Sequence, residues 1–477
     1  MVLQRDLANP IWGWAEPGEE VTVAIAGQIH ETTAGEDGRW SVVLEPMAGS
    51  GYAMRMTIAA GAETVVLSNI VVGEVWVCSG QSNMRWSVAQ SDDADLETAT
   101  ANYPNIRLVT VPNLGTQEKQ DDFDGRWEIC TPETVGGFSA IGYFYGRQLH
   151  QTLGVPIGLI NNAWGGSAAE AWVSRETLET DERFADVIEK WTEIEATYDH
   201  EKAVEAWKAR AEEAKLAGRP VPRPPADQLR GNQRPGNIWA GVLHPTIGYG
   251  MRGAIWYQGE SNASRAHQYR DLFSLLISEW REAWGIGDFP FYWVQLADFK
   301  AEQPEPGDSD WAELREAQTQ TLALPNTGQA VIYDIGEGRD IHPRDKQNVA
   351  KRLARLALAK DYGMPIEHLS PTFQSMEVEE GKVALTFDNV GSGGLYAFDT
   401  EEVTGFAVAG EDRVWHWAEG RVVAPDKVEI SSEAVPAPVA VRYAWADNPV
   451  ANLRSRLGLP VVPFRTDDWP GVTGGGE

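Results

Sequence analysis

The sequence lacks the long apolar runs that mark membrane-spanning proteins. No stretch of about 18 apolar residues occurs in the chain, so we expect no transmembrane helix. Cysteine is also scarce, with only Cys78 and Cys130 present, and two positions give no basis for arguing a disulfide. Cys78 stands in an apolar run, where we expect it to act as a small buried side chain.

Basic residues are few relative to acidic ones. Lys and Arg total 40 against 70 Asp and Glu, which gives a formal net charge of −30. This excess of negative charge argues against nucleic acid and anionic membrane surfaces as partners. The sequence contains neither a His-Glu-x-x-His motif nor a cluster of cysteines, so we expect no catalytic metal and no cofactor.

A length of 477 residues is too great for one compact core, and the pattern changes twice along the chain. Residues 1–69 contain short apolar runs between turn signals, which is typical of a small β-sandwich. Residues 70–365 alternate strands and helices, and 366–477 return to strands. The last region either packs with the first or forms part of a split β domain, and Gly474 to Gly476 are expected to fray.

The middle region predicts a parallel sheet covered by helices on both faces, because its strands are almost continuously apolar. The expected helices are 140–153, 269–283, 311–322 and 346–360, and the expected strands are 71–78, 106–110, 157–161, 253–258, 291–296 and 330–334.

Residues 176–232 interrupt this pattern with charged helical sequence and a proline-rich linker at 219–225. We interpret them as an insertion on the rim of the site, and a plain solvated excursion is the alternative.

One stretch, Gly-Glu-Val-Trp-Val-Cys-Ser-Gly-Gln-Ser-Asn-Met at 73–84, organises the chain. A buried strand ends at Ser79-Gly80, and Ser82 follows at the expected start of a helix. A serine in this position stands where α/β sheets place their ligands. Helix N–H groups there face any developing negative charge. Ser82 is therefore a candidate nucleophile, with a helix cap as the alternative.

Three further polar stretches follow or precede expected elements. Paired glycines at 165–166 come after the strand 157–161 and let the backbone approach a substrate. Gln258 ends the next strand and has an amide to donate to an oxyanion. His342 lies before the last helix, where it would act as general base to Ser82, oriented by Asp340.

Four blocks in this order resemble the sialate O-acetylesterase family of SGNH hydrolases, which is related to the acetylxylan esterases. They are Gly-Gln-Ser-Asn-Met, Asn-x-x-Trp-Gly-Gly, Trp-Tyr-Gln-Gly-Glu-Ser-Asn and Asp-Ile-His-Pro, and the resemblance covers most of residues 2–360. It implies a three-layer α/β/α domain with a parallel sheet, flanked by β-rich regions, that removes O-acetyl groups from sugars. The first five residues resemble an interior motif of the family, so we expect a secreted or periplasmic protein whose leader is missing here.

The resemblance also implies a role for each block. Ser82 matches the nucleophile and His342 the base, while the N–H groups of Ser82 and Gly165 and the side chain of Gln258 match the oxyanion hole. Gly165 is preferred to Gly166 for this role.

Asp340 matches the catalytic acid, although the superfamily usually spaces acid and base as Asp-x-x-His rather than Asp-x-His. Asp334 and Glu337 therefore stay as alternatives, as does a Ser–His dyad with a backbone partner in place of the acid.

Four other residues are candidate substrate contacts. Trp86 and Trp164 have rings that either stack on a sugar or pack in the core. Glu260 is interpreted mainly as a buried group that holds loops together, because a carboxylate beside an oxyanion hole would oppose charge development. His244 is either structural or part of the pocket wall.

The sugar is less defined by the sequence than the chemistry. A sialate is an anion and would need an arginine, for which Arg85 and Arg265 are candidates, whereas the acidic composition favours neutral glycans such as acetylxylan. A non-catalytic glycan-binding protein with a relict hydrolase domain is the alternative of a different class. The pair Ser82 and His342 argues against it.

Overall fold

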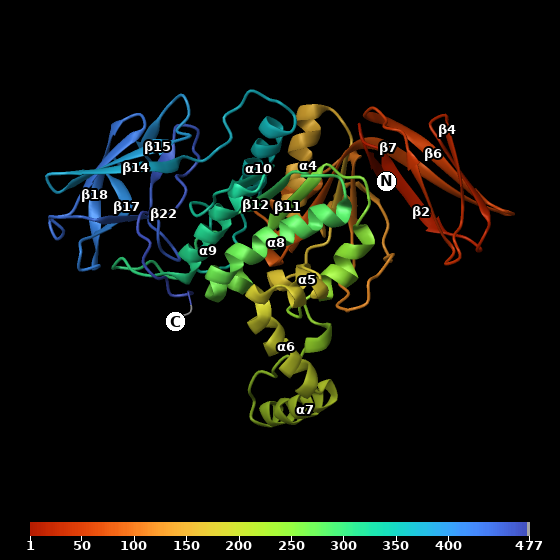
Figure 1. Ribbon diagram of the computed structural model, residues 1–477, viewed down its shortest axis with the longest axis horizontal. Coiled ribbons are helices and arrows are strands. Elements are labelled where there is room, and N and C mark those ends of the chain that lie inside the picture. Colours follow the sequence, from red (N-terminus) through yellow and green to blue (C-terminus); the bar gives the residue numbers. More distant parts are fainter. Residues whose placement is uncertain (475–477) are drawn as a thin grey trace.

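The computed structural model describes residues 1–474 and contains three regions side by side (Figure 1). A sheet with helices on both faces forms the middle, which confirms the predicted α/β class. The two β-rich regions have separate cores and lie at opposite ends of the molecule, so they do not pack on each other. The expectation for Gly475 and Gly476 lies outside the described residues.

The central sheet has the strand order β13-β12-β11-β7-β10-β8-β9, and all pairs from β13 to β8 are parallel. The chain places β8 and β10 on one side of β7 and then β11, β12 and β13 on the other. The strand order therefore reverses at β7, and ligands of open α/β sheets bind at such a switch point. The strands are β7 (Glu63–Gly80), β8 (Tyr103–Thr110), β9 (Glu128–Cys130), β10 (Ile157–Asn161), β11 (Gly253–Tyr257), β12 (Phe291–Val294) and β13 (Thr327–Ala330).

Helices cover both faces of the sheet. Successive residues of the central strands point to opposite sides, so apolar side chains are available for packing on each face. On β7, Val75 and Val77 join the core beneath α8 (Ala266–Trp284) and α9 (Asp310–Gln320). Trp76 and Cys78 join the core beneath α4 (Ala140–Leu153) and α10 (Lys346–Lys360). The bounds expected for α4 and α10 are confirmed. Cys78 and Cys130 are both buried, free thiols.

The last strand of the sheet differs from the expectation. β13 ends at Ala330, whereas the apolar run predicted a strand at 330–334. Val331 and Tyr333 are instead buried in the core of the C-terminal region, and Asp334 pairs with Arg352. The apolar run therefore contributes side chains to the cores of both the middle and the C-terminal regions, and its composition alone does not reveal this.

The strand β7 joins the N-terminal region to the middle without a break. Its first part pairs with β6 and its second part lies in the central sheet, so the expected boundary at residue 69 falls inside one strand. Glu74, fully buried on β7, pairs with Arg5 and with Arg252, 2.9 Å away. The other N-terminal strands are β1 (Val2–Gln4), β2 (Asn9–Trp14), β3 (Glu20–Ile25), β4 (Gln28–Thr33), β5 (Arg39–Leu44) and β6 (Ser50–Ala60).

The insertion contains three α-helices, α5 (Arg175–Thr180), α6 (Ala185–Thr197) and α7 (His200–Leu216). α6 and α7 project away from the sheet (Figure 1). Its returning segment reaches the strand ends, where Asn232 and Gln233 donate to the carbonyls of Gly165 and Gly166.

The C-terminal region is built on a seven-stranded sheet with the order β14-β15-β19-β18-β17-β20-β22. Arg442 and Arg465 anchor it to the middle region through ion pairs with Asp308 and Glu316. Its strands are β14 (Thr372–Glu379), β15 (Lys382–Asp388), β16 (Leu395–Ala397), β17 (Val403–Ala409), β18 (Trp415–Ala424), β19 (Lys427–Ser431), β20 (Ala440–Tyr443), β21 (Leu453–Ser455) and β22 (Phe464–Arg465).

The middle region also contains three short α-helices, which are α1 (Ser82–Arg85), α2 (Ala94–Ala99) and α3 (Pro132–Val135). In residues 1–474, no helix combines the length and apolar character needed to cross a bilayer. The secreted or periplasmic location stays a prediction.

The turn after β7 depends on a glycine. Gly80 has φ +131°, and a Cβ placed there would lie 2.2 Å from the carbonyl oxygen of Tyr257.

We expect Gly80→Ala to lower the melting temperature more than Gly154→Ala. Gly154 has φ +68° with open space around it, so its substitution carries only the conformational cost of about 1–2 kcal/mol. Equal losses in thermal unfolding would contradict the steric argument.

Candidate active site

Ser82 begins α1 directly beyond the end of β7, at the switch point of the sheet. It lines a cleft of about 630 Å³ together with Arg85, Trp86, Asn161 and His342. We call this the Ser82 cleft; the remaining wall comes from Ser87, Gln90, residues 110–113, Gly137 and Ala163. The structure thus brings the predicted nucleophile and base into one cavity, although they are 260 positions apart in the sequence.

Hydrogen bonds between strand ends hold the serine in place. The N–H of Gln81 donates to the carbonyl of Tyr257 at 2.9 Å, and the N–H of Trp164 donates to the carbonyl of Gly80 at 2.9 Å. The turn after β7 is therefore bonded to the last residue of β11 and to the segment that follows β10. These backbone bonds fix the height at which Ser82 stands above the sheet.

The ring of His342 is held by two neighbours. Its Nδ1 lies 3.5 Å from Oδ1 of Asp340, and the same oxygen accepts the backbone N–H of His342 at 2.9 Å. The indole of Trp86 stacks on the imidazole with ring centroids 4.9 Å apart and an interplanar angle of 13°. Because Nδ1 faces the carboxylate, Nε2 is left to act on a substrate or on Ser82.

The two alternative acids have other partners. Asp334 forms a two-pronged pair with Arg352 at 2.6 and 2.8 Å. Glu337 accepts the backbone N–H of Arg344 at 2.8 Å. Of the three carboxylates considered, Asp340 is the one in contact with His342, despite the short Asp-x-His spacing.

The surroundings of His342 favour the neutral imidazole. Burial lowers its pKa below the usual value, and the positive charge of Lys346 acts in the same direction, while Asp340 opposes them. A neutral imidazole is the form that accepts a proton. In residues 1–474 no hydrogen bond joins His342 to Ser82, and such bonds are often formed only when substrate is bound.

Gly165 lies beside the serine. A Cβ placed on Gly165 would be 3.5 Å from Cβ of Ser82, in ordinary contact. Its carbonyl accepts the side-chain amide of Asn232 at 2.5 Å, which holds the loop from the far side. Within the described part of the chain, the N–H groups of Ser82 and Gly165 donate to no protein acceptor. Both are available to an oxyanion.

Gln258 is not placed as predicted. It is fully buried, and its Nε2 donates to the carbonyl of Ser167 at 3.1 Å and to Oδ1 of Asn262 at 2.7 Å. Its Oε1 accepts the hydroxyl of Tyr269 at 3.0 Å. Both amide hydrogens are therefore committed, and none is left for an oxyanion. The position at a strand end suggested the role. One partner, Asn262, ends the same motif, and the other two, Ser167 and Tyr269, lie outside it.

The sequence reasoning missed a hydrogen-bond network around Asn83. The Nδ2 of Asn83 donates to Glu260 at 2.6 Å and to the carbonyl of Ile341 at 2.9 Å, while its Oδ1 accepts from Nζ of Lys346 at 2.6 Å. Asn83 follows Ser82 and Ile341 precedes His342. One amide side chain therefore ties the segment of Ser82 to the loop that carries His342.

Two ionisable groups belong to this network, of which Lys346 is fully buried and Glu260 partly buried. Burial lowers the pKa of Lys346 to about 7 and raises the pKa of Glu260. The contacts of Glu260 are those of a group that holds two loops together. Asn83 lies in the first of the four sequence blocks, so the sequence contained some indication that it has a role. Lys346 lies at the start of a charged helix, and the sequence contained no such indication for it.

The other candidate contacts divide between the cleft and elsewhere. Trp164 packs against the core on the α8 side rather than lining the cleft. His244 lies in a second cavity, and its Nδ1 contacts the carbonyl of Gln120 at 2.7 Å. Arg265 pairs with Glu170 at 2.6 Å. Arg85 is exposed in the Ser82 cleft and, among the described residues, has no acidic partner.

Comparison with known proteins identifies the domain that carries this site. The family described as carbohydrate esterase, sialic acid-specific acetylesterase matches residues 72–207 and 243–358. The match contains Ser82, Gly165, Asp340 and His342, and it omits the proline-rich return of the insertion.

Individual relatives cover almost the whole chain. A sialate O-acetylesterase from Mus musculus is 31% identical over 97% of this chain and 92% of its own length, and the one from Homo sapiens is 29% identical over 99% and 92%. The crystal structure of a carbohydrate acetylesterase from Xanthomonas citri superposes with a TM-score of 0.83 at 38% identity, covering 98% and 97% of the two chains. The chain therefore belongs to the sialic acid-specific acetylesterase family of carbohydrate esterases, and it is a carboxylic ester hydrolase that acts on acetylated carbohydrate.

Proposed function

We propose that this enzyme removes O-acetyl groups from sugars through an acetyl-serine intermediate on Ser82. The observation that carries the proposal is the shared cleft of Ser82 and His342 at the switch point of the sheet. Asp340 and Trp86 support it further, because they hold the imidazole in one orientation. Serine, an oriented histidine and free backbone donors are the parts that acyl transfer needs.

In the proposed first step, Nε2 of His342 takes the hydroxyl proton of Ser82 while Oγ attacks the acetyl carbonyl carbon. Negative charge develops on the carbonyl oxygen and is stabilised by the N–H groups of Ser82 and Gly165. When the intermediate collapses, the ester bond breaks and His342 returns the proton to the sugar oxygen. Water, deprotonated by His342, then attacks the acetyl-serine and releases acetate and Ser82.

A third donor for the oxyanion is proposed at Asn161 rather than at Gln258. Asn161 lines the Ser82 cleft, and its Oδ1 accepts the N–H of Ala163 at 3.2 Å. Its Nδ2 has only a long contact of 3.5 Å to Thr110. This amide therefore has hydrogen-bonding capacity left over, which Gln258 lacks.

For the sugar, we propose a sialate, with a neutral acetylated glycan such as acetylxylan as the second candidate. The support is Arg85, a cation without an acidic partner among the described residues, which stands in the cleft of a chain with net charge −30. A guanidinium in this setting suits the carboxylate of an anionic sugar. The exposed cleft and the aromatic ring of Trp86 suit a neutral sugar equally well.

Removing the nucleophile is the first test. We expect Ser82→Ala to lower kcat on p-nitrophenyl acetate and on acetylated sugars by at least ~10⁴-fold, with an unchanged melting temperature. The double variant with His342→Ala should lose little more, because the two residues act as a unit. Ser278→Ala, on the exposed side of α8, is the matched control. Native rates in Ser82→Ala would refute the serine mechanism.

The charges around His342 predict how activity varies with pH. The acidic limb of kcat/KM follows deprotonation of the free base, so its apparent pKa should lie below the ordinary histidine value of about 6.5. Lys346→Met removes a positive charge that lowers the pKa of His342, so the limb should move to higher pH. Asp340→Asn removes the opposing negative charge, so the limb should move to lower pH.

The control for this pH experiment is Lys351→Met, an exposed lysine on the same helix α10. Its acidic limb should match that of the unaltered enzyme. An unshifted limb in Lys346→Met would show that the lysine does not act on His342, even if that variant is less stable.

Arg85 distinguishes the two candidate sugars. We expect Arg85→Met to raise KM for 9-O-acetyl-N-acetylneuraminate by at least ~10-fold, since a hydrogen bond to a charged group contributes about 1.5–3 kcal/mol. KM for acetylated xylo-oligosaccharides should change much less, and Arg85→Lys should recover part of the loss. If both substrates suffer equally, or if the unaltered enzyme prefers the xylo-oligosaccharides, the sialate assignment is wrong.

A further inference from the structure

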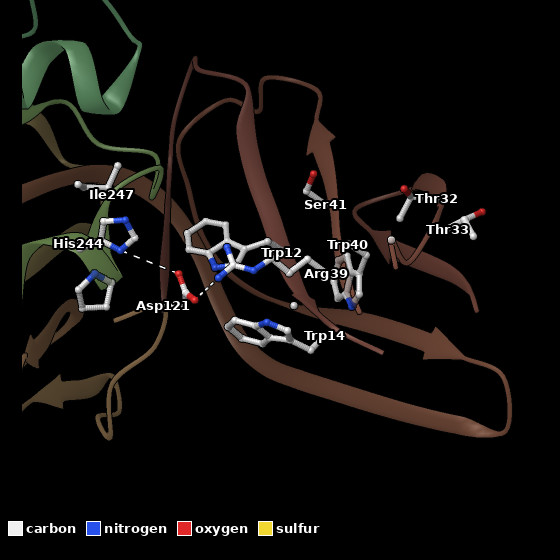
Figure 2. A pocket seen from close by; sticks show the side chains of 13 residues that line it. Trp12, Trp14, Thr32, Thr33, Arg39, Trp40, Ser41, Asp121, His244 and Ile247 are labelled. Carbon is white, nitrogen blue, oxygen red and sulfur yellow. Dashed lines mark hydrogen bonds and ion pairs between the residues drawn. The ribbon is translucent and has the colours of Figure 1, made fainter. Parts of the chain in front are cut away.

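A second cavity, of about 520 Å³, lies where the N-terminal β region meets the middle region (Figure 2). Trp12, Trp14 and Trp40 line it from the N-terminal side, and Asp121 and His244 line it from the other. We call it the tryptophan cavity. It contains neither Ser82 nor His342, so the proposed mechanism gives it no role.

Strand pairing arranges its aromatic wall. Trp12 and Trp14 alternate along β2 and therefore project from the same face. The paired strand β5 places Ser41 opposite Trp12 and Arg39 opposite Trp14. Two indole rings, a guanidinium and a hydroxyl thus share one surface of the β2–β5 ribbon. Figure 2 shows Asp121 between this surface and His244.

The indole of Trp14 is unusually accessible. Trp14 is 49% exposed, and in residues 1–474 only one other tryptophan, Trp417 at 42%, is exposed to a similar degree. Tryptophan is normally well buried, because its ring carries a large apolar surface. An exposed indole in a cavity of this volume leaves an apolar ring face open to a ligand.

The polar groups of the cavity are paired in charge. Arg39 and Asp121 form an ion pair across the cavity, and their side chains are 53% and 36% exposed. Nδ1 of His244 lies 4.0 Å from the other oxygen of Asp121. Donors and acceptors therefore stand side by side with little net charge, and solvent reaches them.

We propose that the tryptophan cavity is a second carbohydrate-binding site that takes a neutral saccharide unit. Sugar hydroxyls both donate and accept, so one sugar can satisfy Arg39 and Asp121 together while its C–H face covers the indoles. An anionic sugar is disfavoured because the charge of Arg39 is already matched. A purely apolar ligand would bury both charged groups without giving them new hydrogen bonds.

The size of the cavity also favours a sugar over a protein partner. Its volume is within the range of about 300–1,000 Å³ that is usual for small-ligand pockets. A stable protein interface instead covers about 800 Å² on each partner, mostly over broad and flatter surfaces.

A single chain segment connects this cavity to the Ser82 cleft. Asn113 lines the cleft and Asp121 lines the tryptophan cavity, and eight residues of chain span at most about 29 Å. The segment is tethered, because the N–H of Gln120 donates to the carbonyl of Ala240 at 3.0 Å and the side chain of Gln117 donates to the carbonyl of Pro235 at 2.9 Å. A glycan held at the indoles would therefore remain close to the esterase cleft.

Calorimetric titration of the full chain with xylohexaose tests the proposal. This probe carries no acetyl group, so binding is measured without turnover. We expect millimolar or tighter binding that is retained in Ser82→Ala and in Trp417→Ala. Trp14→Ala should weaken it by at least about tenfold, in line with the loss of an aromatic contact. Trp14 is exposed, so this variant should fold normally.

Several results would overturn the proposal. They are the absence of any heat with xylohexaose, equal affinity in Trp14→Ala and the unaltered protein, or a Trp14-dependent heat seen only with the anionic N-acetylneuraminate.

A second measurement separates this inference from the proposed chemistry. In Trp14→Ala, KM for acetylated xylan should rise at least threefold, while hydrolysis of p-nitrophenyl acetate is unchanged. If the unaltered enzyme fails to hydrolyse esters through Ser82, the serine mechanism falls, and the calorimetry still decides on the cavity.

Discussion

The carboxyl end of β7 is the constraint on which the site depends. This strand carries buried side chains on both faces, forms the centre of the sheet and extends from the N-terminal region. At Gly80 its backbone passes so close to Tyr257 that only a glycine fits. The next residues must turn there, and the turn lifts Ser82 above the sheet at the point where the strand order reverses. The position of Ser82 therefore follows from backbone packing before any polar group acts on it.

The Asn83 network makes a second demand on the same turn. Fully buried Lys346 and partly buried Glu260 lie beside it, and burying charge is costly unless the groups find partners. The amide of Asn83 bonds to Lys346, to one oxygen of Glu260 and to the carbonyl before His342, while Oε2 of Glu260 has no hydrogen-bond partner among the described residues. The network therefore contributes mainly by fixing the positions of the two loops, rather than by adding to the free energy of unfolding. The loop that carries His342 has little apolar surface of its own, and the buried amide of Asn83 gives it a fixed place beside Ser82.

Much of the fold could be predicted from residue patterns because the middle region obeys local rules. Apolar runs gave the strands, and a capping serine, Ser139, gave the start of α4, where its hydroxyl accepts the N–H of Gly142 at 3.1 Å. The failures occur where a run serves a neighbour that lies far along the chain. Residues 331–334 continue an apolar run, yet Val331 and Tyr333 are buried by the C-terminal region.

The same division applies to the candidate site. Ser82, Gly165 and His342 stand in compact motifs, and their proximity follows from parallel strands ending at one edge. Gln258 stands in an equally compact motif, but its amide is consumed by Ser167 and Asn262. A sequence motif indicates where a residue lies along the backbone, but it does not show which hydrogen bonds the side chain makes within the folded protein. Lys346 shows the converse, because nothing in its local sequence indicates that this helical lysine is fully buried and donates to Asn83 near His342.

Electrostatics connects the two cavities to the acidic character of the whole chain. A net charge of −30 repels anionic glycans at long range, although salt screens this repulsion beyond about 10 Å. Close recognition of an anion therefore has to come from a local cation, and Arg85 provides one inside the cleft. The tryptophan cavity has no such surplus, since Arg39 is neutralised by Asp121. A terminal acidic sugar and the neutral units of the same glycan would thus find different surfaces. The tethered segment at 113–121 keeps those surfaces on one body, so binding at one would raise the effective concentration at the other.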